Sequence, residues 1–147
     1  AFLERLAADI RLRSGDPKAA VAIAQAAATR YPQSRALVHM QAQALTDAGE
    51  HQKAVAYLKD QLSLYRSDPV LWRLLAQAYN AQGQLAEAHR AAAEEYALVG
   101  GWMAAIDQLR LAQRAGTLDF YTASQVDARI RDLQATYTRE QQERAGK

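Results

Sequence analysis

The chain lacks cysteine, a strong excess of charge of one sign, and any long apolar run. Without cysteine, disulfide bonds and thiolate metal sites are excluded, while the cellular compartment stays open. The eighteen basic and sixteen acidic side chains give a net charge of +2 and are mixed along the 147 residues, so no strong field for nucleic acid or membranes is expected. Apolar runs such as residues 19–24 are far shorter than the roughly 20 residues of a membrane-spanning helix.

A short pattern, a glycine followed five residues later by an alanine, recurs along the chain. The glycines are Gly15, Gly49 and Gly83, and the alanines are Ala20, Ala54 and Ala88, so the interval is 34 residues each time. A second alanine column falls at Ala8, Ala42 and Ala76. A period between about 20 and 50 residues is typical of solenoids and related repeat architectures.

Each block contains two segments of helical period, in which the two alanine columns face each other across the turn. The glycine falls where the first helix must stop, because a residue without Cβ adopts the left-handed conformation that satisfies the last carbonyls. Asp16 and Pro17 provide an N-cap and a first helical residue for the next helix, and Asp68 and Pro69 repeat the device. The sequence therefore predicts an all-α fold of antiparallel helix pairs in a right-handed superhelix.

The pattern divides one domain, residues 1–147, into successive units. Three full repeats are predicted at 1–34, 35–68 and 69–102. Gly100 and Ala105 repeat the figure only 17 residues after Gly83 and Ala88, which predicts a half-offset repeat at 86–116 that shares one helix with the third block. A long capping helix is expected at 119–143, with Asp119 as its N-cap, because a solenoid needs its last face covered.

The third block carries the most complete set of marker residues, namely Trp72, Leu75, Ala76, Tyr79, Gly83 and Ala88. This set resembles the tetratricopeptide repeat, a 34-residue helix-turn-helix unit with the pattern W-x₂-L-[small]-x₂-Y, then glycine, then alanine. The resemblance implies that the first helices of the repeats line a concave face that binds a protein or peptide. The expected partner-binding groove consists of His39, Gln43, Arg73, Gln77, Asn80, Arg90 and Glu94.

The later half of the chain carries a more specific likeness. The half-offset repeat, followed by Asp119-Phe120-Tyr121 and Asp127-Ala128-Arg129, resembles the C-terminal repeat region of BepA-type proteins. The resemblance covers roughly residues 35–135 and is most specific over 86–133. These proteins are periplasmic zinc metalloproteases that assist outer-membrane β-barrel assembly. The resemblance implies a periplasmic module of a longer protein, joined to a zinc-containing protease domain, with outer-membrane protein clients and the barrel-assembly machinery as partners.

No catalytic, metal or cofactor-binding residue is predicted within this chain. His39, His51 and His89 are followed by Met, Gln and Arg, so none begins the H-E-x-x-H zinc motif of a metalloprotease. We therefore expect a non-enzymatic module that recruits substrates or assembly partners, with neither nucleic-acid binding nor membrane insertion. A stand-alone tetratricopeptide scaffold or adaptor unrelated to proteolysis remains the alternative at this point.

Overall fold

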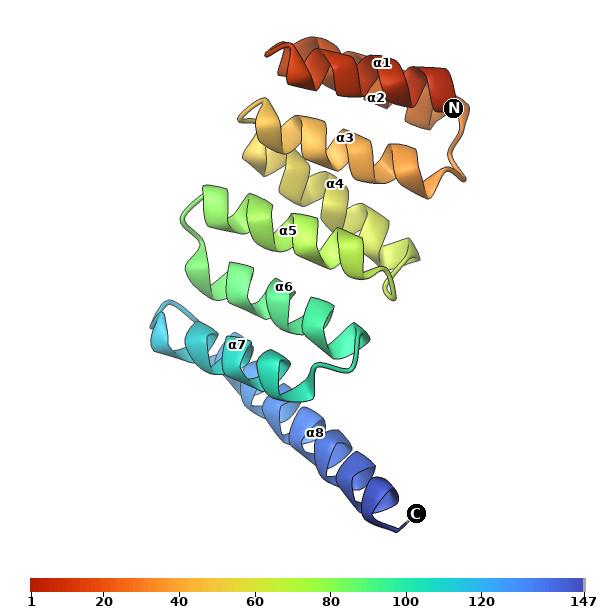
Figure 1. The fold of residues 1–147 in the computed structure, drawn as a ribbon. Helices are drawn as coiled ribbons and strands as arrows, with labels where there is room; N and C mark the ends of the chain where they lie inside the picture. The colour runs from red at the N-terminus through yellow and green to blue at the C-terminus, as the bar shows by residue number, and fades with distance from the viewer. Residues whose placement is uncertain (147) are drawn as a thin grey trace.

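The computed structural model describes residues 1–146, which form eight α-helices and no strand. The helices are α1 (Phe2–Arg13), α2 (Pro17–Arg30), α3 (Arg35–Asp47), α4 (His51–Leu64), α5 (Pro69–Ala81), α6 (Leu85–Leu98), α7 (Trp102–Arg114) and α8 (Phe120–Ala145). Successive helices stack down the molecule (Figure 1). The all-α repeat fold predicted from the sequence is confirmed.

The turns within the helix pairs close in the same way at each repeat. Gly15, Gly49, Gly83 and Gly100 all have a positive φ, as the glycine pattern predicted. After α5, for example, the Gly83 amide donates to the Asn80 carbonyl at 3.0 Å, and the Gln84 amide donates to the Tyr79 carbonyl at 3.0 Å. This pair of bonds is the Schellman closure of a helix C-terminus, so the glycine interval sets the interval of the helix ends.

The predicted N-caps are also confirmed. Asp16, Asp68 and Asp119 precede α2, α5 and α8, and each accepts a hydrogen bond from a backbone amide two or three residues on, at 3.1, 2.9 and 2.7 Å respectively. A carboxylate at this position satisfies an amide that has no partner within the helix and complements the helix dipole.

The core is formed by two clusters of buried side chains that meet at α6. The first runs from α3 to α6 and includes Leu58, Leu71 and Ala91. The second runs from α6 to α8 and includes Ala93 and Ile106. Helix α6 packs on both α5 and α7, as α2 packs on α1 and α3 and α4 packs on α3 and α5.

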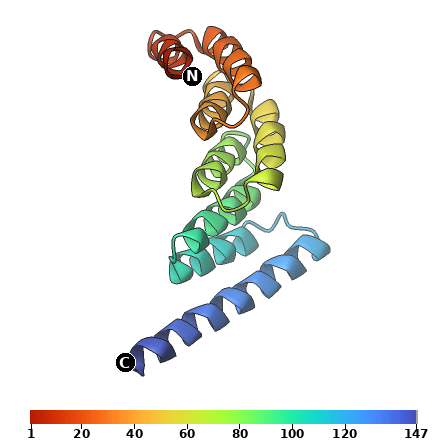
Figure 2. The same cartoon turned by 90° about the vertical axis from the view of Figure 1, so that its right-hand side faces the viewer.

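The end of the stack differs in arrangement from the rest. Helices α1, α3 and α5 lie along one side and α2 and α4 along the other, whereas α8 crosses the end of the stack obliquely (Figure 2). Helix α8 packs against α7, and only Val126 and Leu133 of its residues are buried. A hollow is consequently left between α4 and α8 on the side of α2 and α4.

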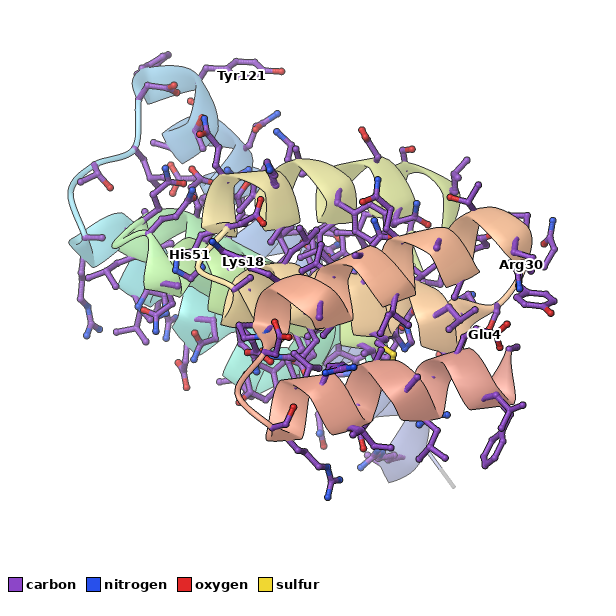
Figure 3. All side chains as sticks on the ribbon, turned by 90° about the horizontal axis from the view of Figure 1, so that it is seen from above. Glu4, Lys18, Arg30, His51 and Tyr121 are labelled. Atoms are coloured by element: carbon purple, nitrogen blue, oxygen red, sulfur yellow. The ribbon has the colours of Figure 1, made fainter. Side chains whose placement is uncertain are left out.

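The first helix pair has the smallest apolar core. Its buried side chains are all alanines, at positions 8, 20, 24 and 27. An exposed ion pair at one end joins Glu4 to Arg30, with 3.3 Å between Oε1 and Nη1, while Lys18 lies at the opposite end of α2 (Figure 3). The side chains of Phe2 and Leu3 are 75% and 73% exposed, so α1 presents apolar surface to solvent.

Candidate partner-binding pocket

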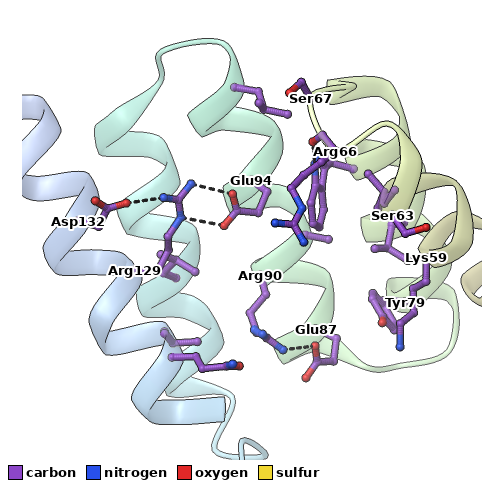
Figure 4. Close-up of a pocket in the computed structure, with 18 of the residues that line it drawn as sticks. Lys59, Ser63, Arg66, Ser67, Tyr79, Glu87, Arg90, Glu94, Arg129 and Asp132 are labelled. Carbon is purple, nitrogen blue, oxygen red and sulfur yellow. Dashed lines mark hydrogen bonds and ion pairs between the residues drawn. The ribbon is translucent and has the colours of Figure 1, made fainter. Parts of the chain in front are cut away.

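A hollow of about 1100 Å³ lies between α4 and α8 (Figure 4). Helices α5 and α6 form its floor, and α7 contributes one residue, Leu109. The lining residues are Lys59, Leu62, Ser63, Arg66, Ser67, Trp72, Leu75, Tyr79, Glu87, Arg90, Ala91, Glu94, Leu98, Leu109, Gln125, Val126, Ala128, Arg129 and Asp132. The volume and the open shape suit a segment of another polypeptide.

The floor of the pocket is apolar. Leu62, Leu75, Ala91 and Val126 are buried in the core beneath it, and Leu98 at its edge is 41% exposed. A floor of this kind gains free energy when a ligand removes it from water, at about 25 cal/mol for each Å² of apolar surface.

The aromatic side chains of the floor carry polar tips. The Trp72 indole Nε1 donates to the Arg66 carbonyl at 2.8 Å, which ties the α4–α5 loop to α5. Burial, reinforced by the negative charge of Glu87, raises the pKa of the Tyr79 hydroxyl, so this group stays protonated at neutral pH. The pocket therefore combines apolar contact area with fixed hydrogen-bonding groups.

The acidic side chains of the pocket are paired with arginines. Arg129 of α8 donates from Nε and Nη2 to the two carboxylate oxygens of Glu94 on α6, at 3.0 and 2.8 Å, and its Nη1 lies 2.5 Å from Asp132. These hydrogen bonds, with Glu94 the stronger partner, raise the pKa of the Arg129 guanidinium above its ordinary value. Arg90 pairs with Glu87 on the same helix at 2.7 Å.

The residues predicted to form one groove lie in two different surroundings. Arg90 and Glu94 line the pocket, whereas Arg73, Gln77 and Asn80 do not. On α5 the pocket is lined by Trp72, Leu75 and Tyr79, which at 3.6 residues per turn point roughly 130° away from the predicted groove positions. The two sets are separated because the face of α6 that carries Arg90 and Glu94 is directed toward α4 and α8.

Three of the other predicted groove residues, Arg73, Gln43 and His39, have a side-chain partner within the chain. Arg73 lies 3.9 Å from Glu95, and the Gln43 amide donates to Asp47 at 2.9 Å. Gln77 and Asn80 are exposed on α5. His39 Nε2 lies 2.7 Å from Asp68, so its ring joins α3 to the N-cap of α5.

The Asp68 carboxylate is the most buried charged group described, at 4% exposure. Arg35 donates to it from Nε at 3.1 Å and Nη2 at 2.5 Å, and the Arg35 guanidinium lies 4.6 Å above the centre of the Tyr65 ring. Burial alone would raise the pKa of Asp68, but the hydrogen bonds from His39 and Arg35 outweigh it and lower this pKa below its ordinary value. The cluster ties α3 to the start of α5.

Lys59, Arg66, Arg129 and Asp132 line the pocket but are not among the groove residues predicted from the sequence. A partial signal was present in the sequence, because Lys59, Ser63 and Arg66 recur at the spacing of one helix face, although α4 ends at Leu64 and Arg66 lies in the following loop. No local pattern shows that this face lies opposite Arg129, which is 63 positions away from Arg66 along the chain.

Neither metal ligation nor membrane crossing has support among residues 1–146. No group of three or more His, Cys, Asp or Glu side chains in this part of the chain is arranged to hold a metal ion. No helix here combines the length and the apolar character that crossing a bilayer requires.

Comparison with known proteins assigns a repeat family to part of the chain. Residues 45–94 match the family model of the tetratricopeptide repeat, from the end of α3 through α4 and α5 into α6. The prediction of this repeat is confirmed over that segment, which carries the pocket residues from Lys59 to Glu94. Tetratricopeptide repeats mediate protein–protein interactions.

No curated protein matches the sequence significantly. Among solved structures, the chain is similar to "MamA RS-1 ArsTM double mutant", with 19% sequence identity, a TM-score of 0.39, and coverage of 92% of this chain and 94% of that chain.

Proposed function

We propose that this chain, whose residues 45–94 match a tetratricopeptide repeat, is a protein-interaction module that binds an extended segment of a partner protein in the pocket between α4 and α8. The observation that carries the proposal is the hollow of about 1100 Å³ with an apolar floor and charged walls. The floor supplies contact area, and the walls supply hydrogen-bonding groups that select among segments.

The module itself is proposed to be non-catalytic. Glu94 and Asp132 accept hydrogen bonds from Arg129, and Glu87 accepts one from Arg90, so these carboxylates serve as partners of guanidinium groups. The Ser63 hydroxyl donates to the Asp60 carbonyl at 2.6 Å. These arrangements favour structural ion pairs and a helix-surface serine over an acid-base pair or an activated nucleophile.

The finer proposal is that the module recruits substrates or assembly partners for a zinc metalloprotease domain in the same periplasmic protein. Its support is the resemblance of residues 86–133 to BepA-type proteins. This segment contains α6 and α7 and the first half of α8, and it contributes Arg90, Glu94 and Arg129 to the pocket. Outer-membrane protein clients and the barrel-assembly machinery are the partners that this proposal names.

A blocking experiment tests the pocket as the binding site. Peptides are selected from a random library on the wild-type chain, and their affinities are compared with those for Ser63→Trp and Gln77→Trp. Both positions are exposed on helices, but only Ser63 lines the pocket. We expect Ser63→Trp to weaken binding at least tenfold and Gln77→Trp to leave it unchanged. The opposite result would move the site to the α5 face that carries Arg73, Gln77 and Asn80.

The link to proteolysis has a separate test in the coding sequence upstream of residue 1. An H-E-x-x-H motif in frame with this chain would support the recruitment role. A complete open reading frame without one would favour the stand-alone scaffold or adaptor.

A further inference from the structure

We infer that the pocket between α4 and α8 selects peptide segments in which an acidic side chain stands next to a large apolar one, with the acid directed to the α4 wall. This inference rests on the proposed peptide-binding function and adds the chemistry of the peptide. The α5 side chains that line this pocket lie on a different face of the helix from Arg73, Gln77 and Asn80.

The wall formed by α4 and the α4–α5 loop, called here the α4 wall, carries two positive charges that no ion pair neutralises in the described part of the chain. Lys59 and Arg66 line the pocket and are exposed, and neither forms an ion pair with any side chain in residues 1–146. The Arg66 side chain reaches from the α4–α5 loop into the hollow (Figure 4). Because the Trp72 indole holds the Arg66 carbonyl at 2.8 Å, the base of this cation is fixed in place.

The opposite wall has the reverse charge balance. Arg90 and Glu87 neutralise each other, whereas Arg129 serves two carboxylates, Glu94 and Asp132. One guanidinium beside two carboxylates leaves a formal charge of −1 where α8 meets α6. Lys59 and Arg66 give the α4 wall a formal charge of +2. The field across the pocket therefore favours a ligand carboxylate beside Lys59 and Arg66 and disfavours one beside α8.

The apolar floor lies between these walls and sets the second requirement. Trp72 and Tyr79, which are half-buried, and Leu98, which is 41% exposed, present apolar surface that an aromatic or large aliphatic side chain would cover. A peptide that places such a side chain on the floor brings its neighbouring residue to one wall. An acidic neighbour gains charge-assisted contacts at α4, and a basic neighbour would meet two like charges there.

The two tryptophans of the chain provide a built-in readout. Trp72 lines the pocket and Trp102 does not, so the indole N–H signal of Trp72 in a heteronuclear NMR spectrum reports pocket occupancy and that of Trp102 is an internal control. Trp102→Phe assigns the two signals. The probe is a short peptide containing Phe-Asp-Leu-Phe-Asp, flanked by glycine and serine, with acetylated and amidated ends.

The comparison set changes one property of the probe at a time. Both aspartates become asparagine in one peptide and lysine in a second, and both phenylalanines become serine in a third. A fourth peptide has the asparagine sequence with a free C-terminal carboxylate. The affinities are measured on the wild-type chain, on the double variant Lys59→Glu with Arg66→Glu, and on the matched charge control Lys18→Glu with Arg131→Glu. Lys18 and Arg131 are exposed and lie outside the pocket (Figure 3 shows Lys18).

We expect the aspartate peptide to bind the wild-type chain about fivefold to tenfold more tightly than the asparagine peptide at low salt, the scale of two partly solvated ion pairs. The preference should disappear in the Lys59/Arg66 variant and persist in the control variant. The serine peptide should lose most of its affinity.

Equal binding of the aspartate, asparagine and lysine peptides at Trp72 would overturn the charge selection while leaving peptide binding intact. A preference for the free C-terminal carboxylate over the amidated asparagine peptide would reassign the anion to a chain terminus. A Trp72 signal that no peptide shifts would overturn the peptide-binding function itself.

Discussion

Arg129 on α8 and Glu94 on α6 are 35 positions apart in the chain and form a two-pronged ion pair, with N–O distances of 3.0 and 2.8 Å. The pair links α8, the last helix, to α6. Both residues line the pocket. Paired donors and acceptors in this planar geometry are among the stronger side-chain contacts in proteins.

A double-mutant cycle measures this link. Arg129→Ala, Glu94→Ala and the double variant are compared by urea unfolding, and we expect a coupling energy of about 1–2 kcal/mol for a partly exposed bidentate pair. Arg131→Ala is the matched control, since Arg131 is exposed on the same helix. A coupling energy within error of zero would show that α8 is held by its apolar contacts alone.

Acid stability should depend on Asp68. Its pKa is lowered from 3.8, so the folded state binds this proton less readily than the unfolded chain does. The carboxylate therefore contributes stability above about pH 4, and this contribution is lost as pH falls through the lowered pKa of the folded state. Asp68→Asn should destabilise the chain by about 1–3 kcal/mol at neutral pH and flatten the stability profile below pH 4.

The control for this measurement is Asp60→Asn. Asp60 is exposed on α4, and its side chain makes no ion pair within the described part of the chain. Its substitution should leave the acid profile unchanged. Parallel acid profiles for wild type and Asp68→Asn would contradict a role for the Arg35–His39–Asp68 cluster in stability.

Alkaline stability should depend on Tyr57. Burial raises the pKa of its hydroxyl from 10.0 to about 12, so the unfolded chain releases this proton first as pH rises. The stability that the neutral phenol contributes is complete below pH 10 and is lost as pH rises toward about 12. Tyr57→Phe should reduce the loss of stability over this interval in a pH series of thermal melts. Tyr121→Phe, at a side chain that is 72% exposed, should not.

Replacing a glycine of a repeat turn should destabilise the fold through the backbone conformation that the turn requires, and steric clash should contribute little. Gly83 has a φ of +72°, and a Cβ built there meets no atom within 4 Å. Gly83→Ala should therefore cost about 1–2 kcal/mol through the left-handed conformation alone. Gly83→Asn should cost less, because asparagine tolerates that conformation better. Equal losses in urea unfolding for the two variants would indicate a steric cause.

Local chemistry in the sequence determined the helices and their ends. The glycines at 15, 49, 83 and 100 mark the left-handed helix ends, and Asp16, Asp68 and Asp119 mark the helix starts, because both devices act within a few residues of backbone. The 17-residue step between Gly83 and Gly100 also anticipated the left-handed turn at Gly100 that ends α6. These features depend on neighbours along the chain and can be read from spacing.

The tertiary structure decided which helix faces meet. Spacing alone placed Arg90 and Glu94 in one groove with Arg73, Gln77 and Asn80, but the structure places them beside Lys59, Arg66 and Arg129. The rotation of α6 between α5 and α7 and the oblique path of α8 bring these side chains together. Such contacts join residues many positions apart, and they depend on how whole helices pack, which the period of a repeat does not specify.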